Sequence, residues 1–161
     1  MTRYGAGRSS GAGAIQEEWP PVGSHVVTMR RAYLHHGIYV GCGKVVHYSG
    51  LAHGLRRGPV EEVSLADFAR GHTVRLLERA PAAFDPREIV RRARSRIGED
   101  NYRLFTNNCE HFSEWCVRGV GRSYQVDAVM ALVERPLQIA RRFLRFVNAV
   151  AEAGRSELVS L

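Results

Sequence analysis

The sequence is poor in lysine, in cysteine and in long apolar runs. Lys44 is the only lysine among 23 basic residues, so arginine carries the net charge of +7. Because arginine codons are GC-rich, this skew fits a GC-rich coding genome at least as well as selection for phosphate binding. Net charge bears on partners rather than on fold. No recognised motif, and no basic segment interleaved with aromatics, predicts a specific nucleic-acid partner.

Three cysteines, Cys42, Cys109 and Cys116, are too few for a disulfide framework, and their odd number favours a reducing compartment. The first residues hold no apolar core of signal-peptide length, and no run approaches the ~18 uncharged apolar residues of a membrane-spanning helix. We therefore expect a soluble cytoplasmic protein. Short-spaced metal ligands such as CxxC or HExxH are missing, which disfavours a zinc site, and no cofactor is expected.

The composition that remains is typical of one globular domain. The 161 residues are 45% hydrophobic and 24% charged, which is enough to bury a core without disulfides. Residues 1–18 are rich in glycine and small polar residues, so we expect a flexible leader there. A compact domain over residues 19–125 and a helical extension over residues 126–161 complete the predicted organisation.

Local patterns within the compact domain predict an α+β fold. Runs of β-branched and aromatic residues predict strands at 25–29, 33–40, 44–48 and 73–77. A short helix is expected at 64–69, with Ser64 as its cap, and another begins at Asp85-Pro86, with Ile89, Ala93 and Ile97 on its apolar face. Asn107-Asn108 caps a third helix that is expected to reach about Val120.

The C-terminal extension is predicted as two helical stretches divided by Pro136, since proline cannot donate the helical hydrogen bond. The second stretch pairs a wide apolar surface with three arginines, Arg141, Arg142 and Arg145. Such a helix packs on its own domain or lies on a membrane surface, and packing is the commoner outcome.

Cys109 is the candidate nucleophile, because it lies at the start of the helix that Asn107-Asn108 caps. Free N–H groups and the helix dipole at that position favour a thiolate. A free cysteine is more often a small buried hydrophobe, and this interpretation suits Cys116, which lies within the apolar stripe of the same helix. His111 is poorly placed as a base, because two residues turn a helix by about 200° and the side chain points away from Cys109.

The base is expected on the hairpin formed by the second and third strands. With Gly41-Cys42-Gly43 as a three-residue loop, Val40 pairs with Lys44 and Gly37 lies opposite His47. His35 then shares a face with His47 as its diagonal neighbour. A two-residue loop would shift the register by one and put His36 on that face instead. We favour His35 as the base and His47 as the residue that orients it.

Three motifs in this order resemble the lecithin:retinol acyltransferase (LRAT) family, which includes the H-Ras-like suppressor phospholipase/acyltransferases. They are YLHHGIYVG at residues 33–41, VVHY at residues 45–48 and NCEHF at residues 108–112. The family pattern has a histidine before the IYVG run, a second histidine twelve positions on and an intact NCEHF box, and His35 and His47 match that spacing.

The resemblance implies a circularly permuted papain-like fold, in which an antiparallel sheet packs against the helix that carries the cysteine. It also implies a catalytic domain over residues 19–125, with Cys109 as nucleophile, His35 as base and His47 as third polar residue. Family members form an acyl-cysteine from a phospholipid ester and pass the acyl group to retinol, an amine, a lysophospholipid or water. This sequence has no apolar C-terminal span, which suggests a bacterial relative that touches membranes only peripherally, through Arg141, Arg142 and Arg145.

Two other functions remain open from the sequence. A cysteine peptidase or amidase would use the same fold and the same residues on an amide. A non-catalytic binding module on the same fold is the second alternative, although the intact set of Cys109, His35 and His47 argues against it.

Overall fold

The computed structural model describes residues 3–4, 19–50 and 58–158. Apart from Arg3–Tyr4, the leader predicted over residues 1–18 lies outside this description, and so does most of the loop predicted over residues 51–59. The chain divides into two units, Met1–Ser123 and Tyr124–Leu161.

The first unit is built on an antiparallel sheet whose strands lie in the order β1-β6-β2-β3-β4-β5. These strands are β1 (Arg3–Tyr4), β2 (His25–Met29), β3 (Leu34–Gly41), β4 (Lys44–Tyr48), β5 (Val60–Ser64) and β6 (Val74–Leu76). The observed class, α+β with an antiparallel sheet, confirms the predicted fold class. Strand β5 was not predicted, because its sequence VEEVS carries two adjacent glutamates, which are weak strand formers.

Three helices flank the sheet: α1 (Leu65–Ala69), α2 (Pro86–Ser95) and α3 (Cys109–Arg118). Each begins at the cap that the sequence predicts. The Ser64 side chain accepts the N–H of Asp67, and the Asp85 side chain accepts that of Glu88. The Asn108 side chain accepts the N–H groups of both Glu110 and His111. Helix α2 ends earlier than expected, so Ile97 lies outside it and is exposed rather than on its buried face.

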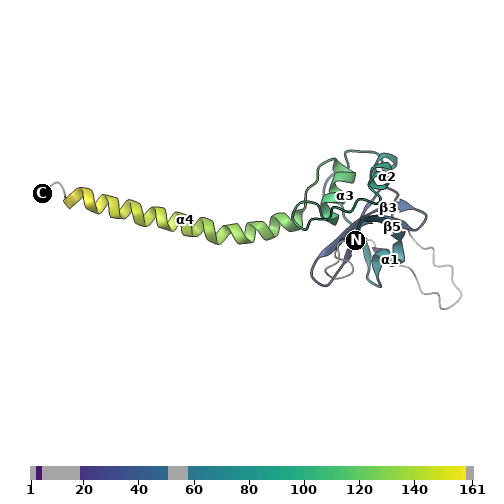
Figure 1. Cartoon of the computed structure of the whole chain (residues 1–161), viewed down its shortest axis with the longest axis horizontal. Helices are drawn as coiled ribbons and strands as arrows, with labels where there is room; N and C mark the ends of the chain where they lie inside the picture. Colours follow the sequence, from purple (N-terminus) through teal and green to yellow (C-terminus); the bar gives the residue numbers. More distant parts are fainter. Residues whose placement is uncertain (1–2, 5–18, 51–57, 159–161) are drawn as a thin grey trace. The chain divides into compact units, whose positions relative to one another are not determined.

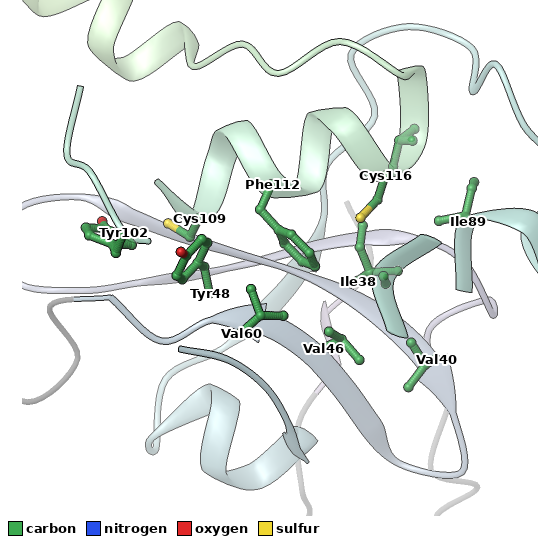
Figure 2. Close-up of a cluster of buried hydrophobic side chains, with 12 residues drawn as sticks. Ile38, Val40, Val46, Tyr48, Val60, Ile89, Tyr102, Cys109, Phe112 and Cys116 are labelled. Carbon is green, nitrogen blue, oxygen red and sulfur yellow. The ribbon is translucent and has the colours of Figure 1, made fainter. Parts of the chain in front are cut away.

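The helices cover opposite faces of the sheet, and each face has its own apolar core (Figure 1). Helices α2 and α3 bury the larger core, in which Phe112 and Cys116 of α3 point at Ile38, Val46 and neighbouring strand residues (Figure 2). Helix α1 buries the smaller core through Leu65, Phe68 and Ala69. Cys116 is therefore a core residue, as predicted, and Cys42 is exposed at the hairpin tip.

The β3–β4 hairpin has the predicted register but a different loop. Gly37 pairs with His47, as expected, whereas Lys44 pairs with Gly41 and not with Val40. The loop is thus the two residues Cys42 and Gly43, both with positive φ. A bulge between Tyr39 and Gly41 adds one residue to β3 and cancels the shift that the shorter loop would cause.

The second unit contains α4 (Tyr124–Leu158), one helix that includes Pro136. The prediction of two separate C-terminal helices is therefore wrong. Proline at position 136 leaves the Leu132 carbonyl without its helical partner. Leu132 is exposed, so water can satisfy that carbonyl and the helix continues.

Candidate active site

Helix α3 holds Cys109 at its first position through a network around Asn108. The Asn108 side chain accepts the N–H of Glu110 at 2.9 Å and of His111 at 3.0 Å. It also donates to the Leu104 carbonyl at 2.8 Å, which ties the preceding loop to the helix start. The Nδ1 atom of His111 faces the Asn108 N–H at 3.4 Å and completes a capping box. His111 is thus a cap, in agreement with its exclusion as the base.

The loop before α3 is held by a second polar cluster. Arg96 forms two hydrogen bonds of 2.5 Å with the Glu99 carboxylate, which also accepts the Asn107 side-chain amide at 3.0 Å. These hydrogen bonds hold the pKa of Glu99 below its usual value. The Tyr48 hydroxyl accepts the Asn101 N–H at 2.6 Å. The loop that leads to Cys109 is therefore anchored to α2 and to β4.

The Cys109 thiol is buried, with 3% of the residue exposed. Burial raises its pKa to about 11, although the backbone N–H groups of His36, Glu110 and Cys109 itself favour the thiolate. The prediction that the helix start yields a thiolate is therefore wrong for this state, since desolvation outweighs the N–H groups. Among these groups, the His36 N–H belongs to β3, so that strand as well as α3 acts on the pKa of the thiol.

The two predicted histidines meet across the hairpin. The Nε2 atom of His35 lies 3.0 Å from Nδ1 of His47, and their rings are nearly perpendicular. Phe68 of α1 stacks on His35 and meets His47 edge-on. Gly37 makes room for this packing, because a Cβ there would approach Val45 Cγ1 to 2.6 Å and Phe68 to 3.0 Å.

The expected hydrogen bond between Cys109 and His35 is not formed. With Nε2 of His35 engaged by His47, only Nδ1 is available to a thiol, and this buried atom has no hydrogen-bond partner among the described residues. Hydrogen bonds between catalytic groups are often long in a ligand-free enzyme and shorten when substrate binds. The site therefore contains, on β3, a ring nitrogen that no described residue engages, and the His36 N–H of the same strand favours the thiolate of Cys109.

Both histidines are neutral at physiological pH. Desolvation lowers the pKa of His35 well below its usual value, and the nearby charges of His47 and Arg30 act in the same direction. The pKa of His47 falls to about 4, again mainly through burial. Arg30 is fixed in place, since its guanidinium donates to the carbonyls of Phe68 and Ala69. The Cys109 thiol and both imidazoles are thus uncharged at neutral pH.

A cavity of about 390 Å³ opens beside His47. Its charged lining residues are Arg30, Glu61, Asp67 and Arg70. Glu61 comes from the unpredicted strand β5, and its carboxylate lies 3.5 Å from Nε2 of His47. Because β5 was missed, the sequence offered no signal for this contact.

The sequence also gave no indication of a second polar cluster, which lies on the α3 face of the sheet. His25 Nε2 lies 2.9 Å from His36 Nδ1, and Glu110 of α3 accepts Arg79 at 2.5 Å and Ser123 at 2.7 Å. Glu110 is fully buried. His36 therefore points away from His47, as the register predicts, and the cluster fastens α3 to the sheet. Among the described residues, no group of three or more potential ligands is placed to hold a metal ion.

Comparison with known proteins agrees with the motifs and the geometry. The profile of the lecithin retinol acyltransferase family matches residues 18–122. The chain belongs to this family. It is 31% identical over 136 residues to human phospholipase A and acyltransferase 2, covering 74% of this chain and 84% of that protein. It is 30% identical over 129 residues to phospholipase A and acyltransferase 3 of human and of Pongo abelii, covering 70% of this chain and 80% of each.

The matched segment contains every element that builds the Cys109 and histidine arrangement, from β2 to the end of α3. Helix α4 begins two residues beyond it. Within the described part of the chain, no helix combines the length and the apolar character needed to cross a membrane.

Proposed function

We propose that this LRAT-family protein is a thiol-dependent acyltransferase or acyl hydrolase that forms an acyl-cysteine at Cys109 from phospholipid or related lipid esters. The proposal rests chiefly on one observation: the buried Nδ1 of His35 has no hydrogen-bond partner in the part of the chain that the structure describes, and the N–H of the next residue on β3, His36, favours the thiolate of Cys109. The names of the relatives, phospholipase A and acyltransferase, favour lipid esters over peptides. We assign residues 19–125 as the catalytic domain and its fold as circularly permuted papain-like, with the histidine strands β3 and β4 preceding α3.

In the first step, Nδ1 of His35 removes the thiol proton as the sulfur attacks the ester carbonyl and a C–S bond forms. A base is required, because a thiol with a pKa of about 11 is almost entirely protonated at neutral pH. Neutral His35 can serve as that base. The N–H groups that face the thiol stabilise negative charge that develops there. The ester C–O bond then breaks, and His35 returns the proton to the departing lysophospholipid oxygen.

In the second step, an alcohol, an amine or water delivers its proton to Nδ1 of His35 and attacks the thioester. The C–S bond breaks and the proton returns to sulfur, which regenerates the thiol. His47 holds the imidazole of His35 through the 3.0 Å hydrogen bond in both steps.

The test is detection of the acyl-enzyme. The protein is incubated with vesicles of phosphatidylcholine and phosphatidylglycerol, and acylated peptides are identified by mass spectrometry. We expect the adduct on the Cys109 peptide in the unaltered chain and in Cys42→Ser, whose cysteine is exposed and remote. Cys109→Ala should lose the adduct and at least about 10³-fold in fatty-acid release. Unchanged release by Cys109→Ala would refute the proposal.

We further propose that α4 contacts anionic membranes reversibly. At about 100° per residue, Arg141, Arg142 and Arg145 fall on one side of the helix, and Ile139, Ala140, Phe143 and Leu144 gather on the rest of its circumference. Arginines beside an apolar face suit a lipid headgroup layer.

Cosedimentation with phosphatidylglycerol vesicles tests this contact. The double variant Arg141→Glu/Arg142→Glu should lose most of the binding. A control with the same change of charge, Arg75→Glu/Arg87→Glu, alters exposed residues of the first unit and should retain it. Equal losses in both variants would mean that overall charge, and not α4, drives association.

A further inference from the structure

Glu61 belongs to a set of three residues that pair directly across the adjacent strands β3, β4 and β5. Gly37 of β3 pairs with His47 of β4, and His47 pairs with Glu61 of β5. Directly paired residues project from the same face of a sheet. The Glu61 carboxylate consequently reaches Nε2 of His47, at 3.5 Å, on the side opposite the hydrogen bond to His35.

The direction of the His35–His47 hydrogen bond decides whether His35 can act as a base. The bond joins Nε2 of His35 to Nδ1 of His47, and either nitrogen can carry its proton. If His47 donates through Nδ1, the proton of neutral His35 lies on its own Nδ1, and that atom cannot accept a proton from Cys109. If His35 donates, its Nδ1 is free to accept.

The productive direction requires a specific tautomer of His47. When Nδ1 of His47 accepts from His35, the N–H of neutral His47 must lie on Nε2. That is the nitrogen that faces Glu61, and a carboxylate favours an N–H directed at it. The burial that keeps both rings neutral leaves one proton on each, so selecting the tautomer of His47 also selects that of His35.

We propose that Glu61 is a positioning residue that holds His47 as its Nε2–H tautomer and thereby leaves Nδ1 of His35 free to take the thiol proton. The inference rests on the acyl-transfer function proposed above. Other charged groups line the same cavity beside His47, namely Arg30, Asp67 and Arg70. Of these charged groups, Glu61 has its carboxylate 3.5 Å from Nε2 of His47.

Glu62 supplies a matched control. It is the next residue on β5 and pairs with Val46, so it projects from the other face of the sheet. There its carboxylate accepts the Nε of Arg94 at 2.9 Å, on the side of α2. A Glu62→Ala variant therefore removes the same charge from the same strand without touching His47.

The experiment combines two measurements on the full chain. Nitrogen-15 NMR of histidine-labelled protein reports which ring nitrogen carries each proton. We expect His47 as the Nε2–H tautomer in the unaltered chain and in Glu62→Ala. In Glu61→Ala, the Nδ1–H form should rise severalfold. The kcat for fatty-acid release should fall about three- to tenfold with KM nearly unchanged. Glu61→Gln should recover most of kcat, because its carbonyl oxygen accepts the same N–H.

Two results would overturn the inference: His47 protonated on Nδ1 in the unaltered chain, or a tautomer that Glu61→Ala leaves unchanged. The NMR result does not depend on catalysis. If Cys109→Ala keeps full activity while Glu61→Ala still changes the tautomer, the proposed function fails and the positioning contact stands.

Discussion

At the scale of single residues, the site depends on how burial alters ordinary side chains. Cys109 and His35 are unremarkable in the sequence, and helix position alone predicts a thiolate. In the folded chain, desolvation reverses that prediction and leaves both the thiol and the His35 imidazole neutral. The reversal could not be predicted, because the degree of burial depends on residues distant in the sequence, such as Phe68 against His35 and Tyr48 in the core around Cys109.

The raised thiol pKa predicts the pH dependence of alkylation. At pH 7 a thiol with a pKa of about 11 is thiolate in only about one molecule in 10⁴, so iodoacetamide should modify Cys109 slowly. The rate should rise about tenfold per pH unit up to that pKa. Peptide-level mass spectrometry in a Cys42→Ser background measures it. A rate that levels off below pH 7 would indicate a preformed thiolate–imidazolium pair instead.

Gly37 is a second residue whose importance depends on the tertiary structure. Replacing it with alanine should destabilise the protein by about 1–3 kcal/mol, because the new methyl group would overlap Val45 and press on Phe68. Urea unfolding followed by circular dichroism measures the change. Gly121→Ala is the control, since the nearest atom to its Cβ lies 4.0 Å away, and an equal loss there would contradict this reason.

At the scale of elements, caps and patterns were predicted well and pairing was not. Asn108, Asp85 and Ser64 start their helices as expected, because a cap is decided by residues within one turn. Strand β5 was missed, because it is stabilised by pairing with β4 and not by its own composition. The bulge in β3 was also missed, and yet the predicted partner of His47 is right because the bulge offsets the short loop.

The cap of α3 yields a prediction at this scale. Asn108→Ala removes the acceptor for two N–H groups and a donor to Leu104. We expect a loss of about 1–2 kcal/mol in the free energy of unfolding, measured with urea, together with a lower rate of acylation. His111→Ala should cost less, since its own contact is 3.4 Å long. A larger loss of stability in His111→Ala than in Asn108→Ala would contradict the view that the Asn108 cap is the main restraint on Cys109.

At the scale of the whole molecule, the two faces of the sheet carry different buried polar clusters. The His35–His47 pair lies with α1 on one face, and the His25–His36 pair lies with α3 on the other. Burial lowers the pKa of all four imidazoles. Because these four buried histidines are neutral in the folded chain, acid should favour the unfolded state, in which they can bind protons.

Stability should fall as the pH drops below about 6.5, the value of an unfolded histidine. Between that pH and about 4, where His36 and His47 titrate in the folded chain, the unfolded state binds more protons than the native state. The free energy of unfolding therefore rises with pH across this window, by up to about 1.4 kcal/mol per unit for each histidine. Urea unfolding at pH 7, 6 and 5 measures the slope.

A His25→Gln variant should reduce that slope, whereas replacement of the exposed His72 should leave it unchanged. A slope that is equal in the unaltered chain and in His25→Gln would assign the acid sensitivity to other groups.

The family, the α+β class and the helix caps were predictable from the sequence alone, and Cys109, His35 and His47 are the site residues that it proposes. Each of these depends on residue type, periodicity and spacing within short segments. The tertiary structure alone decided that the thiol is neutral, that α4 continues through Pro136, and that Glu61 faces His47. Burial, solvent access to a backbone carbonyl and cross-strand pairing are set by the three-dimensional surroundings of a residue, which local sequence does not encode.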